Sequence, residues 1–446
     1  RRHTRYWRDW SSDVCSSDLK DKFEPVIYNL AWINWQFLQK PWRRVLDNYL
    51  LTPSFETALS RYCYKNNIEY RSFKSSDFSF SNSNLTLNEL AVFSSSLRST
   101  YARKFGSSEI QVGDIDSNVT KFQKKAFFLT KYIISNFIEK NHFENIDQIV
   151  TVNGRFVIDS AVIHTSQENG IKHITLEKIT DHWGRMVSFQ MSTHSVKELI
   201  DLITSQWEHD SKIEKSKCEF IAINHLNKRT LKASLKEPKL TNPSRMKDIF
   251  EIAKTAFCFY VSSDYEFSIW EDQIESTMIG NSQNDVFKWI VNYTKIQNIP
   301  LIVRGYPHPV ESNLCKIENE IWRKKCRDVG AIYIECESQI TSHQLARHAL
   351  INLVYGSTLG AELIWMDLPV LVLSKQPFSN FIQEIEISSE KEFLTKVRQK
   401  DTKVDKYRLL PWAYFMENGG DLMETFEILD NGDIRKNGVF FRSEEH

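Results

Sequence analysis

Several features that identify common classes of protein are missing from this 446-residue sequence. Basic and acidic residues balance at 57 each, so the chain has no net field to attract nucleic acid or an anionic membrane. No stretch approaches the ~20 continuous apolar residues of a membrane-spanning helix. The cysteines include no Cys-x-x-Cys pair, which indicates neither zinc nor an iron–sulfur cluster and fits a reduced, cytoplasmic protein. Gly-x-Gly-x-x-Gly and Gly-Lys-Ser/Thr are also absent, so neither a dinucleotide fold nor a P-loop ATPase is supported.

Both ends of the chain resemble a translated sequencing adapter. The stretch 9–19 reads DWSSDVCSSDL, and residues 442–446 read RSEEH. An ordinary polar terminus is the alternative. We exclude residues 1–19 and 442–446 from fold reasoning, as is done for tags and fusion scars, and we expect the chain between them to be cut at both ends. Roughly 420 residues remain, which is enough for two domains.

The first half contains one clear strand–helix–strand unit. The β-branched run 148–152 predicts a strand, 156–169 a helix that Gly170 closes, and 173–177 a second strand. This order is a βαβ crossover, which implies a parallel sheet. Upstream, the pattern predicts a strand near 23–30 and helices over 54–66 and 118–140.

The second half alternates strands and helices more regularly. A lysine-rich polar stretch at 211–217 predicts the domain boundary, with one domain over 20–214 and the other over 215–441. The alternation predicts a doubly wound α/β sheet whose strands are apolar because helices cover both faces. The expected strands are 256–262, 300–304, 331–335, 351–355 and 369–373, and the expected helices are 270–297, 315–329, 342–350 and 359–365.

Two loops beyond the carboxyl ends of these strands carry side chains suited to a phosphate or a ribose. Ligands of open parallel sheets bind at this edge. Ser262 and Ser263 follow one strand, where small hydroxyl residues allow close approach or, equally, cap the next helix. Arg304-Gly305-Tyr306-Pro307-His308-Pro309 follows another. Its prolines stiffen the turn and present His308 in one direction, where the imidazole can hydrogen-bond a phosphate oxygen.

A third loop, Tyr355-Gly356-Ser357-Thr358-Leu359-Gly360-Ala361-Glu362, joins a strand to a helix. Backbone N–H groups at such a helix start, together with the Ser357 and Thr358 hydroxyls, form an anion site. Glu362 falls one turn into the helix and can accept both hydroxyls of a ribose. The alternatives are helix capping for the hydroxyls and a dipole-stabilised carboxylate for Glu362. We expect the loops at 304 and 355 to lie side by side.

In combination, these motifs resemble the bacterial capsule polysaccharide biosynthesis proteins. The resemblance covers roughly residues 145–420 and rests on a series of short motifs. These are Asn153-Gly154-Arg155-Phe156, Glu177, His182-Trp183, Ser262 to Phe267, Arg304 to Pro309, Tyr355 to Glu362, Pro369 to Leu373, Leu410 to Phe415 and Gly419-Gly420. The family resembles GT-B glycosyltransferases, which implies two Rossmann-like doubly wound domains facing a cleft.

Related sialyl- and Kdo-transferases hold the phosphate of a nucleotide sugar with a His-Pro motif and a Ser/Thr pair. The resemblance places these elements at His308 and Pro309, and at Ser357 and Thr358. It also implies that Glu362 binds the ribose.

The basic residue that assists the phosphates would be Arg304. Tyr306 departs from the Arg-x-His strand end of many relatives, so the donor pocket differs in detail.

The resemblance implies a metal-independent glycosyltransferase with no cofactor beyond its nucleotide-sugar substrate. His308 would stabilise charge on the departing phosphate, usually the largest catalytic term. We expect Glu177 to act as the base that activates the acceptor hydroxyl, and Asn153 and Arg155 to hold acceptor or donor. An ordinary solvated strand-end acid is the alternative for Glu177.

The expected donor is a nucleotide sugar, with a CMP-sugar favoured, and the expected acceptor is a glycan or glycolipid. We expect no nucleic-acid partner and a cytoplasmic protein, peripheral at the inner membrane. A nucleotide-sugar 2-epimerase or a CDP-polyol phosphotransferase on the same fold is one alternative, because fold alone does not separate these activities. A non-catalytic component of polysaccharide assembly or export is another.

Overall fold

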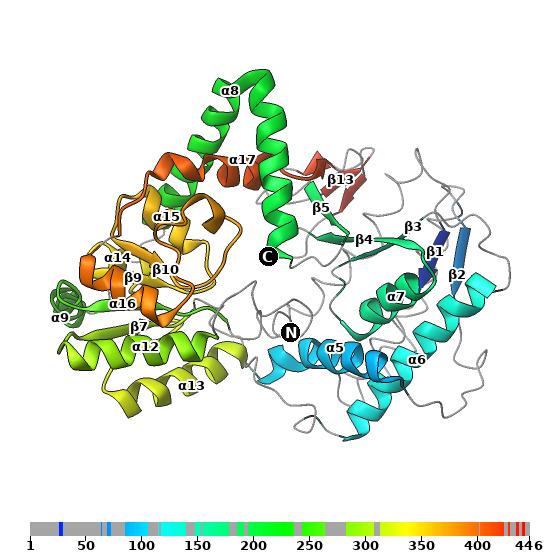
Figure 1. Cartoon of the computed structure of the whole chain (residues 1–446), viewed down its shortest axis with the longest axis horizontal. Helices are drawn as coiled ribbons and strands as arrows, with labels where there is room; N and C mark the ends of the chain where they lie inside the picture. The colour runs from blue at the N-terminus through cyan, green and yellow to red at the C-terminus, as the bar shows by residue number, and fades with distance from the viewer. Residues whose placement is uncertain are drawn as a thin grey trace. The chain divides into compact units, whose positions relative to one another are not determined.

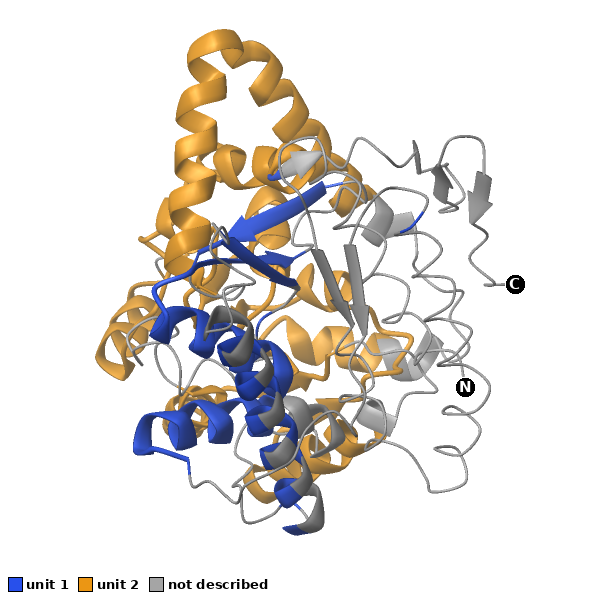
Figure 2. Ribbon diagram, turned by 90° about the vertical axis from the view of Figure 1, so that its right-hand side faces the viewer, with its two compact units in different colours: residues 1–100, 111–193, 420–446 blue, residues 101–110, 194–419 orange. Residues whose placement is uncertain are grey.

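The chain forms two compact units, which Figure 2 colours separately. The first comprises residues 1–100, 111–193 and 420–446, and the second comprises 101–110 and 194–419. The computed structural model describes residues 26–29, 64, 69–72, 85–105, 115, 117–139, 148–152, 154, 156–177, 185–190, 195–235, 243–263, 282–306, 313–400, 402–422, 427–428, 434–436 and 439–441.

A five-stranded parallel sheet forms the centre of the second unit, in the order β10-β9-β6-β7-β8. β6, which comes first in the chain, is the central strand. The chain then adds β7 and β8 on one side of β6 and β9 and β10 on the other, which is the doubly wound arrangement. The predicted α/β class and the doubly wound sheet of the second half are confirmed. Its strands are β6 (Phe257–Tyr260), β7 (Leu301–Arg304), β8 (Ile332–Ile334), β9 (Ile351–Val354) and β10 (Val370–Val372).

Helices cover both faces of this sheet, which explains why its strands are apolar throughout. Figure 1 shows α12 and α13 along one side and α14 and α15 on the other. Aromatic rings fill the first layer: Phe257 stacks on Tyr293 with centroids 5.8 Å apart, and Phe259 meets Trp322 edge-on at 6.2 Å. The helices are α12 (Gln283–Ile296), α13 (Asn313–Val329), α14 (Ser342–Ala346), α15 (Leu359–Trp365) and α16 (Glu390–Gln399).

The second unit begins with α8 (Val196–Leu235), two helical arms that meet at a bend in Figure 1. Glu214 lies at the bend with φ −149° and ψ 71°. The expected boundary at 211–217 therefore falls inside α8, and the units divide at 193/194. The lysines of this stretch form a solvated helix surface, which has the same composition as a linker.

Four further elements complete the second unit. α17 packs against α8, and the Tyr414 hydroxyl donates to Asp210 Oδ2 at 2.9 Å. The elements are α9 (Pro243–Ala253), η4 (Ser379–Phe381), η5 (Lys406–Leu409) and α17 (Leu410–Asn418).

The first unit contains the predicted βαβ crossover, formed by β3 (Gln148–Val152), α7 (Val157–Glu168) and β4 (Lys172–Glu177). Its sheet is mixed, however, because β5 (Arg185–Phe189) and β11 (Asp421–Leu422) join antiparallel to give the order β11-β5-β4-β3. Within the described residues, the complete crossover unit of the first unit is β3-α7-β4, and it lies in this mixed sheet.

The other described elements of the first unit are two helices and two small sheets. β1 and β2 pair in parallel, and β12, β13 and β14 form an antiparallel sheet. The elements are β1 (Val26–Asn29), β2 (Glu69–Ser72), α5 (Leu87–Phe105, whose last turn belongs to the second unit), α6 (Ser117–Glu139), β12 (Glu427–Ile428), β13 (Ile434–Lys436) and β14 (Val439–Phe441).

The described part of the chain was compared with two structural requirements, those of a membrane-spanning helix and of a metal site. None of its helices combines the length and the apolar character needed to cross a membrane. It also contains no group of three or more His, Cys, Asp or Glu side chains arranged to hold a metal ion. Cys218, Cys258, Cys326 and Cys336 are buried free thiols.

Candidate functional site

The candidate site lies at the carboxyl edge of the parallel sheet, where β6 and β9 are neighbours and their connections run to opposite sides. Such a reversal point is where doubly wound sheets bind ligands. The loops after these strands touch, because the Ser262 hydroxyl donates to the carbonyl of Gly356 at 3.0 Å. β6 separates β7 from β9, so the loops at 304 and 355 flank the Ser262 loop and do not lie directly side by side.

The backbone of the loop after β9 is held by hydroxyl groups. Gly356 has φ +60°, a conformation that glycine adopts without strain, and its N–H donates to Ser374 Oγ at 2.7 Å. Ser357 Oγ accepts from the Leu359 N–H at 3.2 Å, so the Ser357 hydroxyl holds the turn that leads into α15. Gly356, Ser357 and Thr358 are half-buried, which makes this loop the accessible part of the edge.

An ion cluster lies immediately behind this loop. Arg229, from the second arm of α8, places Nε 2.9 Å and Nη2 2.8 Å from Oε1 of Glu362. The same Nη2 donates to Thr358 Oγ1 at 3.0 Å. His343 Nε2 lies 2.7 Å from Oε2 of Glu362 and donates to it, since an ionised carboxylate only accepts. Glu362 was expected to bind a ribose, but both of its carboxylate oxygens already have partners within the protein.

The surroundings of Glu362 keep its carboxyl ionised. Burial by itself raises its pKa, but the hydrogen bond from His343 and the positive charge of Arg229 lower the pKa below its usual value. Only 7% of the residue is exposed. A buried carboxylate needs partners of this kind. The position of Glu362 in an otherwise apolar helix therefore indicates that basic partners exist. The sequence analysis did not identify those partners, Arg229 and His343.

The side chain of Arg304 points into the protein. Its Nη1 donates to the carbonyl oxygens of Gly305 at 2.9 Å and Glu335 at 2.5 Å, and its Nη2 to that of Cys336 at 3.3 Å. Burial lowers the pKa of the guanidinium, and Nε has no hydrogen-bond partner among the residues that the structure describes. In this arrangement Arg304 ties the loop after β7 to the loop after β8, and the cation beside the 356–358 loop is Arg229.

The two serines after β6 are also engaged within the protein. The Ser262 backbone N–H donates to Gln283 Oε1 at 2.7 Å, and Gln283 Nε2 returns a hydrogen bond to the Ser262 carbonyl at 3.2 Å. The Ser263 hydroxyl donates to Glu318 Oε1. Both serines are buried, so they support the edge rather than line its surface.

Four expected site residues lie outside the described residues: His308, Pro309, Asn153 and Arg155. Glu177 ends β4 in the first unit and is half-buried.

The glycine of the Asn-Gly-Arg motif has a clear structural reason. Gly154 has φ +77°, and a Cβ there would lie 2.7 Å from the Cγ2 atom of Thr175. A side chain at this position would therefore be both strained and in collision with β4.

Comparison with known proteins gives likenesses of fold. No protein-family model and no curated protein matches the chain. A KpsC β-Kdo 2,4 transferase from Thermosulfurimonas dismutans is 11% identical with a TM-score of 0.38, over 60% of this chain and 80% of that one. A Methanocaldococcus jannaschii UDP-GlcNAc 2-epimerase in complex with UDP-GlcNAc and UDP is 10% identical with a TM-score of 0.28, over 80% of this chain and 94% of that one.

A third similar structure, Escherichia coli trehalose-6-phosphate bound with UDP-2-fluoro glucose, is 8% identical with a TM-score of 0.35. It covers 81% of this chain and 86% of that one. At these identities and TM-scores we carry over no residue role from any of the three, and the site rests on its own geometry.

Proposed function

We propose that the chain is a metal-independent glycosyltransferase of capsular or surface polysaccharide biosynthesis. It transfers a sugar from a nucleotide-sugar donor, with a CMP-sugar favoured, to a glycan or glycolipid acceptor at the inner membrane. The observation that carries the proposal is the edge where β6 and β9 meet. There the accessible loop Gly356 to Thr358 is fixed from behind by Ser374 and Arg229. A nucleotide phosphate is the ligand expected at such an edge.

The charge that develops on the departing phosphate needs positive groups that are already in place. Arg229 meets this requirement, because its guanidinium is oriented by Glu362 and contacts the Thr358 hydroxyl. In this proposal Arg229 takes the role that the family resemblance implies for Arg304.

The remaining roles follow the sequence motifs. His308, between two prolines that predict a stiff turn, stabilises the leaving phosphate. Glu177 accepts the proton of the acceptor hydroxyl, and Asn153 and Arg155 contact acceptor or donor. Ser262 and Ser263 contribute by holding the edge in shape through Gly356, Gln283 and Glu318.

A panel of nucleotide sugars tests this function. Purified protein is first titrated with CMP, UDP and GDP by calorimetry, and then incubated with the corresponding nucleotide sugars with and without a glycan acceptor. A glycosyltransferase forms a new glycosidic product only when acceptor is present. An altered nucleotide sugar formed without acceptor identifies an epimerase instead. Failure to bind any of the nucleotides overturns the proposal in favour of a non-catalytic assembly component.

A further inference from the structure

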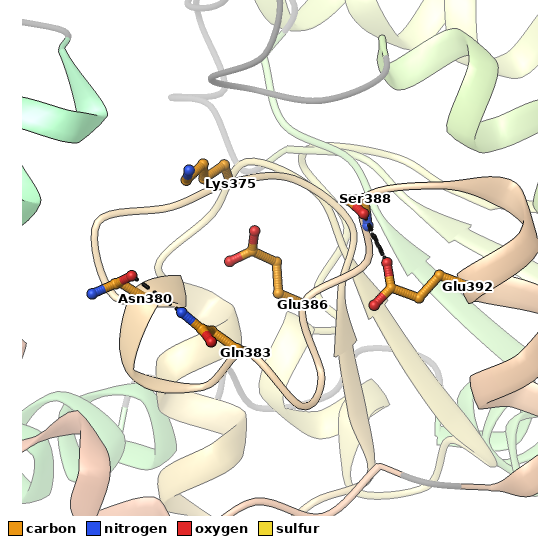
Figure 3. A pocket seen from close by; sticks show the side chains of 6 residues that line it. All are labelled: Lys375, Asn380, Gln383, Glu386, Ser388 and Glu392. Atoms are coloured by element: carbon orange, nitrogen blue, oxygen red, sulfur yellow. Dashed lines mark hydrogen bonds between the residues drawn. The ribbon is translucent and has the colours of Figure 1, made fainter.

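A cavity of about 170 Å³ lies just beyond the carboxyl end of β10. Six polar side chains surround it (Figure 3), and within the described residues no aliphatic or aromatic side chain contributes to its lining. They are Lys375, Asn380, Gln383, Glu386, Ser388 and Glu392. The chain connects the cavity to the candidate nucleotide edge, since Lys375, which lines the cavity, is the next residue after Ser374, whose hydroxyl accepts from the Gly356 N–H at 2.7 Å.

The chain forms the cavity by laying an extended segment beside β10. The Val372 N–H donates to the Ile385 carbonyl at 2.9 Å, and the Ile387 N–H donates to the Val372 carbonyl at 2.8 Å. Ile385 and Ile387 are buried in the core. Because side chains alternate along extended backbone, Glu386 between them faces the opposite way, and Figure 3 shows its carboxylate pointing into the cavity.

The opposite wall is a loop anchored by two apolar side chains. Phe378 and Ile382 are fully buried, which leaves Asn380 and Gln383 on the cavity side, where Gln383 Nε2 donates to Asn380 Oδ1 at 3.3 Å. The cavity is thus shaped by core packing and does not depend on its polar residues to hold it open.

The polar groups of the cavity are arranged around Glu386. Lys375 lies to one side of the Glu386 carboxylate in Figure 3, with its ammonium end turned away from it, and on the other side the Ser388 hydroxyl donates to Glu392 Oε2 at 2.8 Å. Burial raises the pKa of Glu386, while the Lys375 charge opposes that rise. The core isoleucines on either side thus hold a partly desolvated acceptor at the centre of a hydrogen-bonding cavity.

The chemistry of the lining narrows the ligand class. Two carboxylates, two amides, one hydroxyl and one ammonium offer many donors and acceptors, as a polyhydroxylated ring requires. A nucleobase or an acyl chain needs apolar or aromatic lining, and this cavity has none among the described residues. One positive and two negative side chains leave the lining net negative, which disfavours an acidic ligand.

We propose that this cavity binds the sugar ring of the donor, that the sugar is a neutral hexose, and that Glu386 accepts hydrogen bonds from its hydroxyl groups. The inference rests on the proposed nucleotide-sugar function and specifies its substrate. It predicts that a neutral hexose unit strengthens binding of the nucleotide to which it is attached. A sugar that carries a carboxylate should not do so.

The test compares two glutamine variants of the full chain. Glu386→Gln keeps the shape of the lining residue and removes its charge. Glu384→Gln is the matched control, because Glu384 lies on the same segment, pairs with Arg408 and does not line the cavity. UDP, UDP-glucose, UDP-glucuronate, GDP and GDP-mannose are titrated into each protein by calorimetry.

We expect a nucleotide that carries a neutral hexose to bind wild type and Glu384→Gln more tightly than the free nucleotide does. Glu386→Gln should lose about tenfold in affinity for the nucleotide hexose, the size expected for one hydrogen bond to an ionised acceptor, with free-nucleotide affinity unchanged. Equal losses for nucleotide and nucleotide hexose, no loss at all, or tighter binding of UDP-glucuronate than of UDP-glucose would overturn the inference.

If these compounds and CMP all fail to bind, the proposed function fails, and free glucose then tests the cavity separately. Binding of CMP alone would leave the proposed function standing and would overturn the neutral-hexose inference. Saturation-transfer NMR at high glucose concentration should show contact with wild type and Glu384→Gln and a loss of signal with Glu386→Gln. No signal from wild type, or an equal signal from all three proteins, would refute a sugar site at Glu386.

Discussion

Replacing Arg229 by methionine removes the guanidinium from the cluster behind the 356–358 loop while keeping an unbranched apolar stem. Glu362 would lose both donors that contact its Oε1, at 2.9 and 2.8 Å, and Thr358 would lose its 3.0 Å contact. The carboxylate would remain buried with His343 as the described partner of its other oxygen. We expect this change to destabilise the second unit.

The exposure of the pair sets the size of the effect. Breaking a fully buried ion pair costs about 3–5 kcal/mol, and exposed pairs contribute about 0–1 kcal/mol. The side chain of Glu362 is 9% exposed and that of Arg229 is 22% exposed, so the pair lies nearer the buried limit. With His343 still in place, we expect a loss of about 2–3 kcal/mol in the free energy of unfolding near pH 7.

The loss should depend on pH in a defined direction. The pKa of Glu362 is lowered in the folded protein, so its interactions stabilise the fold above the pKa of the unfolded chain. This contribution disappears as the pH falls through the folded-state pKa. In the Arg229 variant the positive charge that opposes the effect of burial is missing, so the pKa of Glu362 rises. Wild type and variant should therefore differ most near neutral pH and converge in acid.

Urea unfolding at matched protein concentration, near pH 7 and again in acid, measures both effects. Hydrogen exchange of the segment from β9 to α15 shows whether the loss is local. Arg323→Met is the matched control: Arg323 also places Nε at 3.1 Å and Nη2 at 2.5 Å from a single glutamate oxygen, on Glu335, but its side chain is 46% exposed. Equal destabilisation by the two substitutions, or a loss independent of pH, would refute the reasoning.

Three further predictions concern the site and the sheet. His308→Ala should abolish sugar transfer with an unchanged circular dichroism spectrum, and turnover retained near the wild-type rate would remove His308 from the mechanism. Tyr260→Phe should destabilise by about 1–3 kcal/mol in denaturant titrations, because the buried Asn352 Oδ1 loses the hydroxyl that donates to it at 2.8 Å; a neutral result would mean that Asn352 finds another donor. Gly305→Ala should lower the melting temperature, because its Cβ would lie 2.5 Å from the Tyr333 hydroxyl oxygen, and an unchanged melting temperature would show that Tyr333 moves aside without cost.

The strands of the second unit could be predicted from the sequence because each is a short apolar run between polar or glycine-containing loops. β7 and β9 were expected at 300–304 and 351–355 and lie at Leu301–Arg304 and Ile351–Val354. Their alternation with helices also indicated the doubly wound sheet. This information is local, and it survives without knowledge of any tertiary contact.

Other elements could not be read in the same way. The lysine-rich stretch 211–217 has the composition of a linker, yet it lies within α8. Composition does not separate a solvated helix surface from a loop when both face water. The antiparallel strand β5 escaped prediction because strand direction depends on which neighbour it pairs with, and here β4 is that neighbour.

The loop after β9 shows the division most clearly. Its glycine, its hydroxyl residues and the acid one turn later can be identified in the sequence, and together they predicted an anion site at a strand end. Tertiary structure alone decided the partners: Arg229, 133 residues before Glu362, supplies the cation, while Arg304 is turned inward to backbone carbonyls. The physical reason is that the pattern of apolar and polar residues along the chain predicts local secondary structure and which of its residues are buried. Ion pairs and cavities depend on side chains that only folding brings together.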